Sequence, residues 1–362
     1  MNDASAYRDP SGVLTEIPRY GPENARPVTP VAMHIPVINL VLFALTLLTT
    51  TMAGAYSNGA DLSLFHPIAS LAALSTGLSF SIPLMAILLS HEMGHYLTSR
   101  RNGVDASLPY FLPAPFPSYM IIGTFGAFIR MREVPRSRRV MFDIGAAGPW
   151  AGMLVALPCV IIGLRLSSVS PLSAQTGFSL ELGNSLLFWG ISRVVLGVDP
   201  NSVNITMHPM AFAGWIGLFV TTLNLLPIGQ LDGGHVVYTL FPRWHRTIST
   251  LFVGSCVLLV VVPLALGYSF WAGWLIWAVL GVALGLGHPV TQDRDTPLDS
   301  RRSIAAWATV VLFIVTFVPV PISISTPEVP TKPQSQSYDV RYQAPANSAP
   351  PHLLKAIATI DR

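Results

Sequence analysis

Two histidines and a glutamate lie within five residues of one another, in the stretch His91-Glu92-Met-Gly-His95. Residues four apart on a helix project from the same face, one turn apart, so both imidazoles could bind one ion with Glu92 beside them. This is the H-E-x-x-H arrangement of zinc sites. The same pattern also occurs by chance in soluble helices, so the neighbouring residues are needed to judge whether it indicates a metal site.

The residues around this stretch place it in a hydrophobic environment. Residues 80–89, just before His91, contain no charged side chain. The whole chain is 51% hydrophobic and only 11% charged, with a mean hydropathy of +0.53, whereas a soluble domain carries about 25% charged residues. We therefore predict a polytopic, multi-pass integral membrane protein.

The charge balance and the cysteines exclude several other classes of protein. The net charge of +3 is small and the basic residues cluster between apolar segments, which indicates membrane orientation and no nucleic-acid partner. Cys159 and Cys256 both lie in apolar runs, so neither a disulfide framework nor a cysteine-based metal site is expected. The partner that composition predicts is the lipid bilayer.

Hydrophobic segments predict an all-α membrane fold with about seven transmembrane helices, since a bilayer needs about 20 apolar residues per helix. Residues 1–34 are expected to form a disordered cytosolic head, residues 35–323 the transmembrane domain, and residues 324–362 a disordered proline-rich tail. The predicted spans are residues 36–55, 75–100, 140–164, 210–240, 249–266, 269–287 and 304–320.

The fourth span is interrupted by Asn224-Leu-Leu-Pro227-Ile-Gly-Gln-Leu-Asp232-Gly-Gly-His235. Proline and glycine break a helix here, and broken helices are tolerated in membranes only where they face protein or a wet cavity. This interruption is therefore a second place where polar chemistry could occur.

Three shorter segments do not fit a simple spanning helix. Four prolines within residues 108–117 each remove a backbone donor and block the preceding turn, so an extended, membrane-dipping loop is expected. Residues 121–132 could form a short strand or β-hairpin at the interface. Residues 185–195 are apolar but too short to cross alone, which predicts an interfacial or re-entrant position.

The basic residues orient the spans. With the N-terminus in the cytosol and the C-terminus outside, fifteen of the 21 basic residues fall in cytosolic segments, as the positive-inside rule requires. His91 then lies nine residues before Arg100, and Asp232 eleven before Arg243, about 14 and about 17 Å from the cytosolic helix ends. A carboxylate at that depth is costly unless it is paired or binds metal, so we predict that Asp232 lies beside the histidines.

Two histidines and one carboxylate leave the fourth position of a tetrahedral zinc open, which is typical of a catalytic rather than a structural ion. Glu92 would take a proton from the attacking water and pass it to the leaving amine. The chemistry that this set predicts is hydrolysis of a peptide bond.

Together the two motifs resemble the site-2 protease family of intramembrane zinc metalloproteases. His91-Glu-Met-Gly-His95 lies in one apolar segment, and Asn224-x-x-Pro227-x-x-x-x-Asp232-Gly-Gly follows in a later one. The resemblance implies that Asp232 is the third ligand of one catalytic Zn²⁺. It also implies that the Asn224 and Pro227 motif holds substrate or the developing oxyanion.

Two further segments are similar to parts of this family, Gly145-Ala-Ala-Gly-Pro149 and Gly123-Thr124-Phe-Gly126. The second implies an edge strand along which substrate could pair. The resemblance covers residues 75–300, the expected catalytic core. Its implied activity is an intramembrane endopeptidase that cleaves transmembrane segments of other membrane proteins, as in regulated intramembrane proteolysis.

Two other functions remain open. A catalytically silent relative would bind membrane helices without cutting them, although Glu92 is intact. A zinc transporter would need polar residues continuing across several spans, whereas here they stop at one depth. Asn224 could merely cap the broken helix, and His235 could either support the metal ligands from behind or simply face a helix.

The expected location is a prokaryotic plasma membrane. Residues 1–34 lack a basic start followed by an apolar core and a cleavage site, so no signal peptide is predicted. A plastid location is also known for the family, but this head lacks the Ser- and Arg-rich character of a transit peptide.

Overall fold

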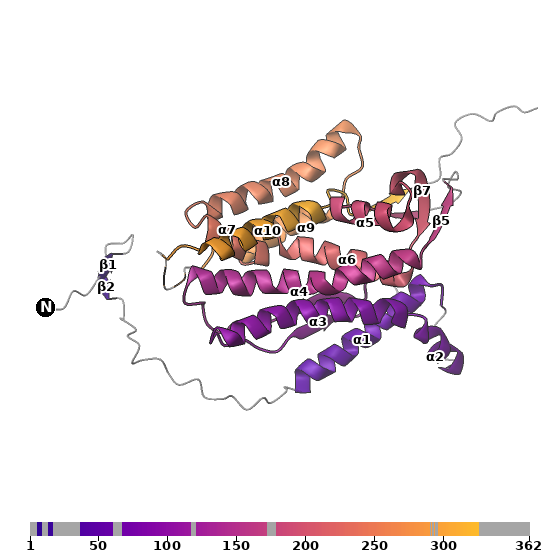
Figure 1. Ribbon diagram of the computed structural model, residues 1–362, viewed down its shortest axis with the longest axis horizontal. Coiled ribbons are helices and arrows are strands. Elements are labelled where there is room, and N and C mark those ends of the chain that lie inside the picture. Colours follow the sequence, from indigo (N-terminus) through magenta and orange to yellow (C-terminus); the bar gives the residue numbers. More distant parts are fainter. Residues whose placement is uncertain are drawn as a thin grey trace, which may run out of the picture.

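Ten helices make up most of the residues that the computed structural model describes, which are 6–8, 14–16, 37–60, 67–116, 121–171, 179–289, 291, 293 and 296–325. Figure 1 shows the longer helices packed side by side in a layered bundle. The helices are α1 Val37–Ser57, α2 Pro67–Ser75, α3 Leu78–Arg101, α4 Arg138–Arg165, α5 Leu186–Leu196, α6 Pro209–Asn224, α7 Asp232–Leu240, α8 His245–Leu266, α9 Gly273–Leu284 and α10 Ser300–Thr316.

Within the described residues, eight short strands form four antiparallel pairs, β1 with β2, β3 with β4, β5 with β7 and β6 with β8. A 3₁₀ turn, Pro200–Ser202, precedes β7. The strands are β1 Ala6–Arg8, β2 Leu14–Glu16, β3 Tyr110–Pro113, β4 Thr124–Phe128, β5 Ser168–Pro171, β6 Ser179–Leu182, β7 Val203–Thr206 and β8 Ile322–Ser325. The fold is thus mostly helical, as predicted, but the described residues contain four small β pairings where the sequence predicts one short hairpin.

Three of the described helices, α1, α4 and α8, are long and apolar enough to cross a bilayer by length and composition. Helix α3 has 24 residues, about 36 Å at 1.5 Å per residue, but it carries the polar residues of the His91 motif. The predicted span 269–287 contains a helix of only 12 residues, because it begins at Gly273 and ends before the positive-φ Gly285. Helix α2 is an additional short helix before α3.

Helices α3, α4 and α6 form the centre of the bundle (Figure 1). Small residues let these helices approach closely, as is usual where van der Waals packing drives association in membranes. A Cβ on Gly217 of α6 would lie 2.9 Å from Ile87 of α3 and 3.3 Å from Ala156 of α4. One layer of side chains therefore joins all three helices.

The predicted interruption of the fourth span separates α6 from α7. Helix α6 ends at Asn224 and α7 begins at Asp232. A Cβ on Gly233 would overlap the carbonyl oxygen of Leu225, and one on Gly234 would overlap that of Gly229. Because glycine leaves this space open, the chain can fold back tightly and start a new helix at Asp232.

The short strand predicted within residues 121–132 is present as β4, and its partner β3 lies within residues 108–117, where the prolines predict an extended loop. Strand β4 pairs with β3, Tyr110 opposite Phe128 and Phe111 opposite Ala127. The side-chain amide of Asn39 in α1 donates to the carbonyl of Pro109 at 2.8 Å, which attaches the hairpin to the first helix.

Both predicted terminal segments fall largely outside the described residues. Strands β1 and β2 form a small hairpin in residues 1–34, and β8 reaches Ser325 at the start of the predicted tail. Residues 326–362 lie outside the described part of the chain.

Candidate metal centre

Three side-chain atoms from two helices form an almost equilateral triangle inside the bundle. His91 Nε2 lies 3.2 Å from His95 Nε2, and each of these nitrogens lies 3.2 Å from the same carboxylate oxygen of Asp232. Only 3% of His91 and 6% of His95 are exposed. Among the described residues this is the single group of three or more His, Cys, Asp or Glu side chains close enough to hold one ion.

The spacing of these atoms fits a tetrahedral zinc ion. Zinc binds histidine nitrogen and carboxylate oxygen at about 2.0–2.2 Å, so two ligands at a tetrahedral angle lie about 3.3 Å apart. The observed distances of 3.2 Å match this value. The residues present therefore fit zinc and leave one side of the triangle for a fourth ligand.

A backbone carbonyl of α4 sets the tautomer of His95. His95 Nδ1 lies 2.7 Å from the carbonyl oxygen of Ile144. A carbonyl only accepts, so Nδ1 carries the proton and Nε2 presents its lone pair to the triangle. This is the arrangement usually found behind metal-binding histidines.

Glycines on one face of α4 make room for the imidazoles. A Cβ on Gly148 would overlap the ring of His95 at Nε2, Cδ2 and Cε1, and one on Gly152 would lie 3.2 Å from His91 Nδ1. Their spacing, with Gly145 three residues before Gly148, places all three on one helix face. Sequence reasoning noted the Gly145 segment as similar to the family but missed this role, although the i, i+3, i+7 spacing could have indicated it.

Asn224, at the last turn of α6, also reaches the triangle. Its side-chain nitrogen lies 3.1 Å from His91 Nε2. Pro227 lies in the turn between α6 and α7, within three residues of this contact. The structure thus brings the Asn224 side chain within hydrogen-bond distance of a candidate ligand.

Glu92 is 6% exposed and lies beside the triangle. The backbone amide of Ile129, the residue after strand β4, faces its carboxylate. Strand β4 therefore ends close to the residue that the sequence predicts as the general base.

The three predicted hairpin residues lie in different environments. Gly123 has a φ of +74° and packs against α1, where a Cβ would come within 2.5 Å of the Thr49 carbonyl. Thr124 is buried and donates to the Leu112 carbonyl at 2.7 Å. Gly126 has a φ of +96° and faces open space. Of these three residues, Gly126 alone has an open space beside its Cα, and its backbone amide donates to the Thr124 hydroxyl at 3.0 Å.

His235 does not bond to the candidate ligands through any described hydrogen bond. Its Nδ1 lies 2.6 Å from His288 Nε2, and a Cβ on Gly145 would lie 2.8 Å from its Cβ. His235 therefore packs on the same face of α4 as His91 and His95, one helical turn after Asp232.

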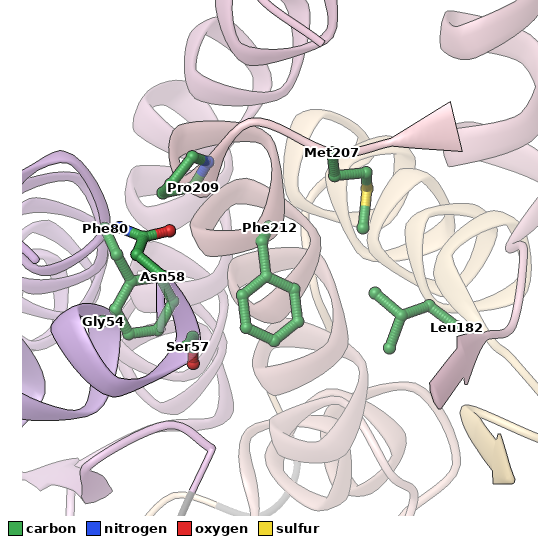
Figure 2. Close-up of a pocket in the computed structure, with 8 residues that line it drawn as sticks. All are labelled: Gly54, Ser57, Asn58, Phe80, Leu182, Met207, Pro209 and Phe212. Atoms are coloured by element: carbon green, nitrogen blue, oxygen red, sulfur yellow. The ribbon is translucent and has the colours of Figure 1, made fainter. Parts of the chain in front are cut away.

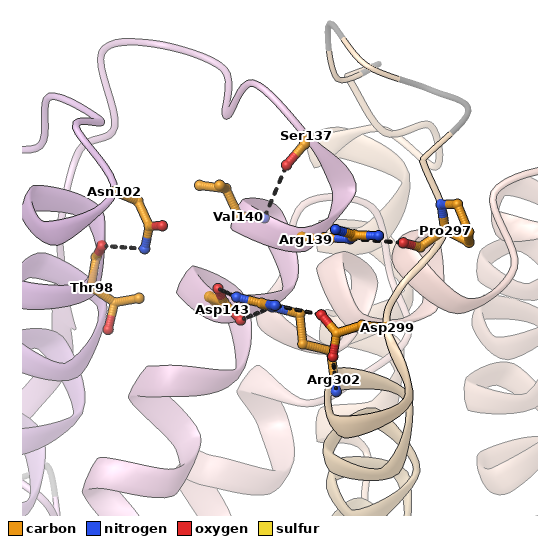
Figure 3. A network of polar contacts seen from close by, with 9 residues as sticks. All are labelled: Thr98, Asn102, Ser137, Arg139, Val140, Asp143, Pro297, Asp299 and Arg302. Carbon is orange, nitrogen blue, oxygen red and sulfur yellow. Dashed lines mark hydrogen bonds and ion pairs between the residues drawn. The ribbon is translucent and has the colours of Figure 1, made fainter.

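An ion-pair network joins α4 to α10 on the far side of α4 (Figure 3). Arg302 donates to both carboxylate oxygens of Asp143, at 2.8 and 2.7 Å, and also contacts Asp299 at 2.5 Å. Bonds from the Arg302 backbone amide and guanidinium lower the pKa of Asp299. Asp143 directly precedes Ile144, whose carbonyl accepts from His95, so the network secures this part of α4.

A separate cavity of about 330 Å³ lies at the other end of α3 and α6 (Figure 2). Phe80 and Phe212 line it, together with Asn58 at the end of α1. Phe80 precedes His91 by eleven residues, about 16 Å along a helix. This cavity contains none of the candidate metal-binding residues.

Comparison with known proteins gives one family and several relatives. The model of peptidase family M50 matches residues 79–267. "Probable zinc metalloprotease EGY1, chloroplastic" of Arabidopsis thaliana is 34% identical over 187 residues, 51% of this chain and 32% of the relative. The rice protein of the same name is 34% identical over 174 residues, 47% of this chain and 29% of the relative.

"Probable zinc metalloprotease EGY2, chloroplastic" of Arabidopsis thaliana is 28% identical over 251 residues, 68% of this chain and 42% of the relative. The chain thus spans about 30–40% of the length of these relatives. The region that the family model matches contains the His91 motif and Asp232.

Proposed function

Because the chain belongs to peptidase family M50, the site-2 protease family of zinc metalloproteases, we propose that it cleaves transmembrane segments of other membrane proteins. One catalytic Zn²⁺ would be held by His91, His95 and Asp232. The observation that carries this proposal is the triangle of 3.2 Å contacts among their side chains, buried between apolar helices. The substrates are therefore membrane proteins, and the reaction is endoproteolysis.

The chemistry divides between the ion and the chain. A zinc ion held by His91, His95 and Asp232 would supply Lewis-acid chemistry, which can polarise a carbonyl and lower the pKa of a bound water toward neutrality. Glu92 takes the proton of the attacking water and later gives it to the leaving amine. Asn224, 3.1 Å from His91 Nε2, holds substrate or donates to the oxyanion as negative charge develops.

Burial of the site dictates how a substrate must enter. A helix keeps its amides in internal hydrogen bonds, so a protease can attack only where the substrate is locally unwound. Strand β4 lies beside Glu92 and ends in exposed Phe128, with Phe125 also exposed. Unwound substrate pairs along β4 and gains the hydrogen bonds that it loses on unwinding.

A proline substitution tests this pairing. Replacing Phe125 and Ala127 by proline removes two backbone donors from β4, and we expect at least a tenfold loss of cleavage with zinc content unchanged. Phe125→Ala with Ala127→Gly is the control for lost side chains. Cleavage at the wild-type rate in the proline variant would rule out pairing along this strand.

The proposed topology has seven spans, with a cytosolic N-terminus and an extracytoplasmic C-terminus. Residues 1–34 form the cytosolic head, residues 35–323 the membrane domain with its catalytic core at 75–300, and residues 324–362 the tail. The described apolar helices support a multi-pass protein. The proposed location is a prokaryotic plasma membrane, whereas the printed names of the plant relatives are chloroplastic.

Metal analysis and cleavage assays on wild type and Glu92→Gln test the function as a whole. We expect one zinc per chain in both proteins, cleavage of a model transmembrane substrate by wild type, and none by Glu92→Gln. His91→Ala, which removes a ligand, should lose both zinc and cleavage. Wild-type protein that binds zinc but never cuts would favour a silent helix-binding relative.

An assay of zinc uptake into proteoliposomes tests the alternative that the protein is a zinc transporter. Zinc uptake into vesicles that contain the protein would indicate a transporter. We expect no uptake, because within the described residues the candidate metal-binding groups occur at one depth and not across the bundle.

A further inference from the structure

Helix α7 carries Asp232 as its first residue but has little to hold it in place by itself. It is only nine residues long and no side chain caps its N-terminus. Helices of this length are not stable in isolation. The rotation and depth of α7, and with them the position of the Asp232 carboxylate, must therefore be set by contacts with neighbouring elements.

His288, in the loop after α9, contacts α7 at two side chains one turn apart. Its Nε2 lies 2.6 Å from His235 Nδ1. Its ring stacks on Tyr238, with centroids 4.1 Å apart and planes inclined by 6°. His235 follows Asp232 by three residues and Tyr238 follows His235 by three, so each of these side chains lies about one turn after the one before it.

The donor and the acceptor in each hydrogen bond of His288 can be assigned. Burial lowers the pKa of His288 to about 4, so the ring is neutral at pH 7. Its Nδ1 lies 2.6 Å from the carbonyl of Pro289, which can only accept. The proton is therefore on Nδ1, and Nε2 must accept from His235 Nδ1–H. The residue at position 288 must therefore present a hydrogen-bond acceptor where Nε2 now lies. An apolar side chain of similar size could not replace it.

The loop that carries His288 is itself attached to the protein at further points. The Thr291 backbone amide donates to the Tyr238 hydroxyl at 3.2 Å. The Asp293 backbone amide donates to the Arg136 carbonyl at 2.8 Å, just before α4. The loop thus links α7 to the start of α4, the helix whose glycines and carbonyl receive His91 and His95.

We propose that His288 is a positioning residue for the metal centre, which through His235 and Tyr238 holds α7 at the rotation that brings Asp232 to His91 and His95. The inference rests on the proposed function, because it assumes that Asp232 is a metal ligand. The described hydrogen bonds and ring contacts of His288 are made with His235, Tyr238, His245 and Pro289, and not with His91, His95 or Asp232. Its role is to keep a short helix from turning or sliding.

Zinc affinity and the mobility of α7 test this role. We expect His288→Ala to bind zinc about 10–100-fold more weakly in chelator competition, the range found when the partner behind a metal ligand is lost. Amides 233–240 should exchange hydrogen faster in the zinc-free variant than in zinc-free wild type. His288→Gln, which keeps an acceptor for His235, should recover part of the affinity.

His208→Ala is the matched control. It removes the histidine that caps α6, where Nδ1 accepts from the Met210 amide at 3.2 Å, at the end of α6 distant from the site. It should lower thermal stability without changing zinc affinity. If His288→Ala does not fold, the comparison of His288→Gln with wild type carries the test.

The outcomes separate the two proposals. Wild-type zinc affinity and wild-type exchange of α7 in His288→Ala would overturn the positioning role alone. Zinc binding that survives His91→Ala would overturn the proposed metal centre, and the exchange of α7 in zinc-free protein would still report on His288.

Discussion

Helices α4 and α8 are both long and apolar enough to cross a bilayer, but they use their length differently. In the most apolar window, 44% of α4 is buried and only 22% of α8. Gly148 and Gly152 of α4 each lie against an imidazole, whereas Gly254 of α8 faces open space. Hydrophobic length therefore accounts for a membrane span, but the face of small residues on α4 is what admits the polar side chains of a site.

The neighbours of the two helices differ in the same way. Helix α4 is joined to α10 by the Arg302–Asp143 pair and by the Trp150 indole, which donates to Thr309 at 3.0 Å. Helix α8 packs mainly on α9 through apolar side chains such as Cys256. The helix that borders the candidate metal centre is joined to its neighbour by short directional bonds. The peripheral helix is held mainly by apolar packing, with a longer hydrogen bond from the Gly229 amide to Ser249 at 3.4 Å.

The largest effect that separates α4 from α8 is expected from Gly148→Ala. The new Cβ would overlap His95 Nε2, the atom that faces the candidate metal centre, and the hydrogen bond from His95 Nδ1 to the Ile144 carbonyl opposes a shift of the ring. We expect zinc affinity to fall by at least 100-fold and cleavage to be lost, with overpacking lowering stability by about 1–3 kcal/mol. Chelator competition and substrate cleavage measure the two effects.

Gly254→Ala is the matched control on α8. No atom lies within 4 Å of its added Cβ, and alanine favours a helix over glycine by about 1 kcal/mol or less. Zinc affinity and cleavage should stay at wild-type values. Equal losses in both variants would mean that α4 has no special role and that the contrast between the helices is wrong.

A smaller effect is expected from Arg302→Met, which removes the directional bond between α4 and α10. The side chain is about one-third exposed, so the loss of stability should be about 1 kcal/mol. Zinc affinity should fall only a few-fold, because the Arg302–Asp143 pair does not contact the candidate ligands. It affects them only by holding the neighbouring Ile144 carbonyl, which accepts from His95. Thermal unfolding with and without zinc measures both, and Arg301→Met, an exposed neighbour, is the control.

The pH dependence of this network follows from Asp299. Its pKa is lowered in the folded protein by bonds from Arg302, so its contribution to stability is present above the ordinary carboxyl pKa. The contribution is lost only as the pH falls through the folded value. The difference in stability between wild type and Arg302→Met should therefore be constant at neutral pH and shrink in acid.

Much of the candidate site could be predicted from the sequence. The evidence lies either in the spacing of nearby residues or in their distance from the arginines that mark the helix ends. The four-residue spacing of His91 and His95 predicts a shared face, and counting residues from the arginines predicts that Asp232 lies at the same level. The resemblance to the site-2 protease family, which rests on these motifs, is confirmed by the match to peptidase family M50. The break between Asn224 and Asp232 and the strand within residues 121–132 are also confirmed.

Other features depend on how helices rotate against one another, which apolar periodicity does not determine. Nothing local indicates that His288 meets His235, since 53 residues separate them. Helix α9 is shorter than its apolar run, because positive-φ Gly285 ends it early. The extra helix α2 lies in a stretch that hydropathy alone assigns partly to a loop.

The carbonyl of Ile144 has a consequence for how this site can change over evolution. His95 depends on a main-chain oxygen, and every residue type supplies the same oxygen at that position. A mutational scan at residue 144 would report packing and miss the hydrogen bond entirely. Selection for that bond must act instead on the residues that set the path of α4. These are the glycines on the face of α4 toward the histidines and the Arg302–Asp143 ion pair.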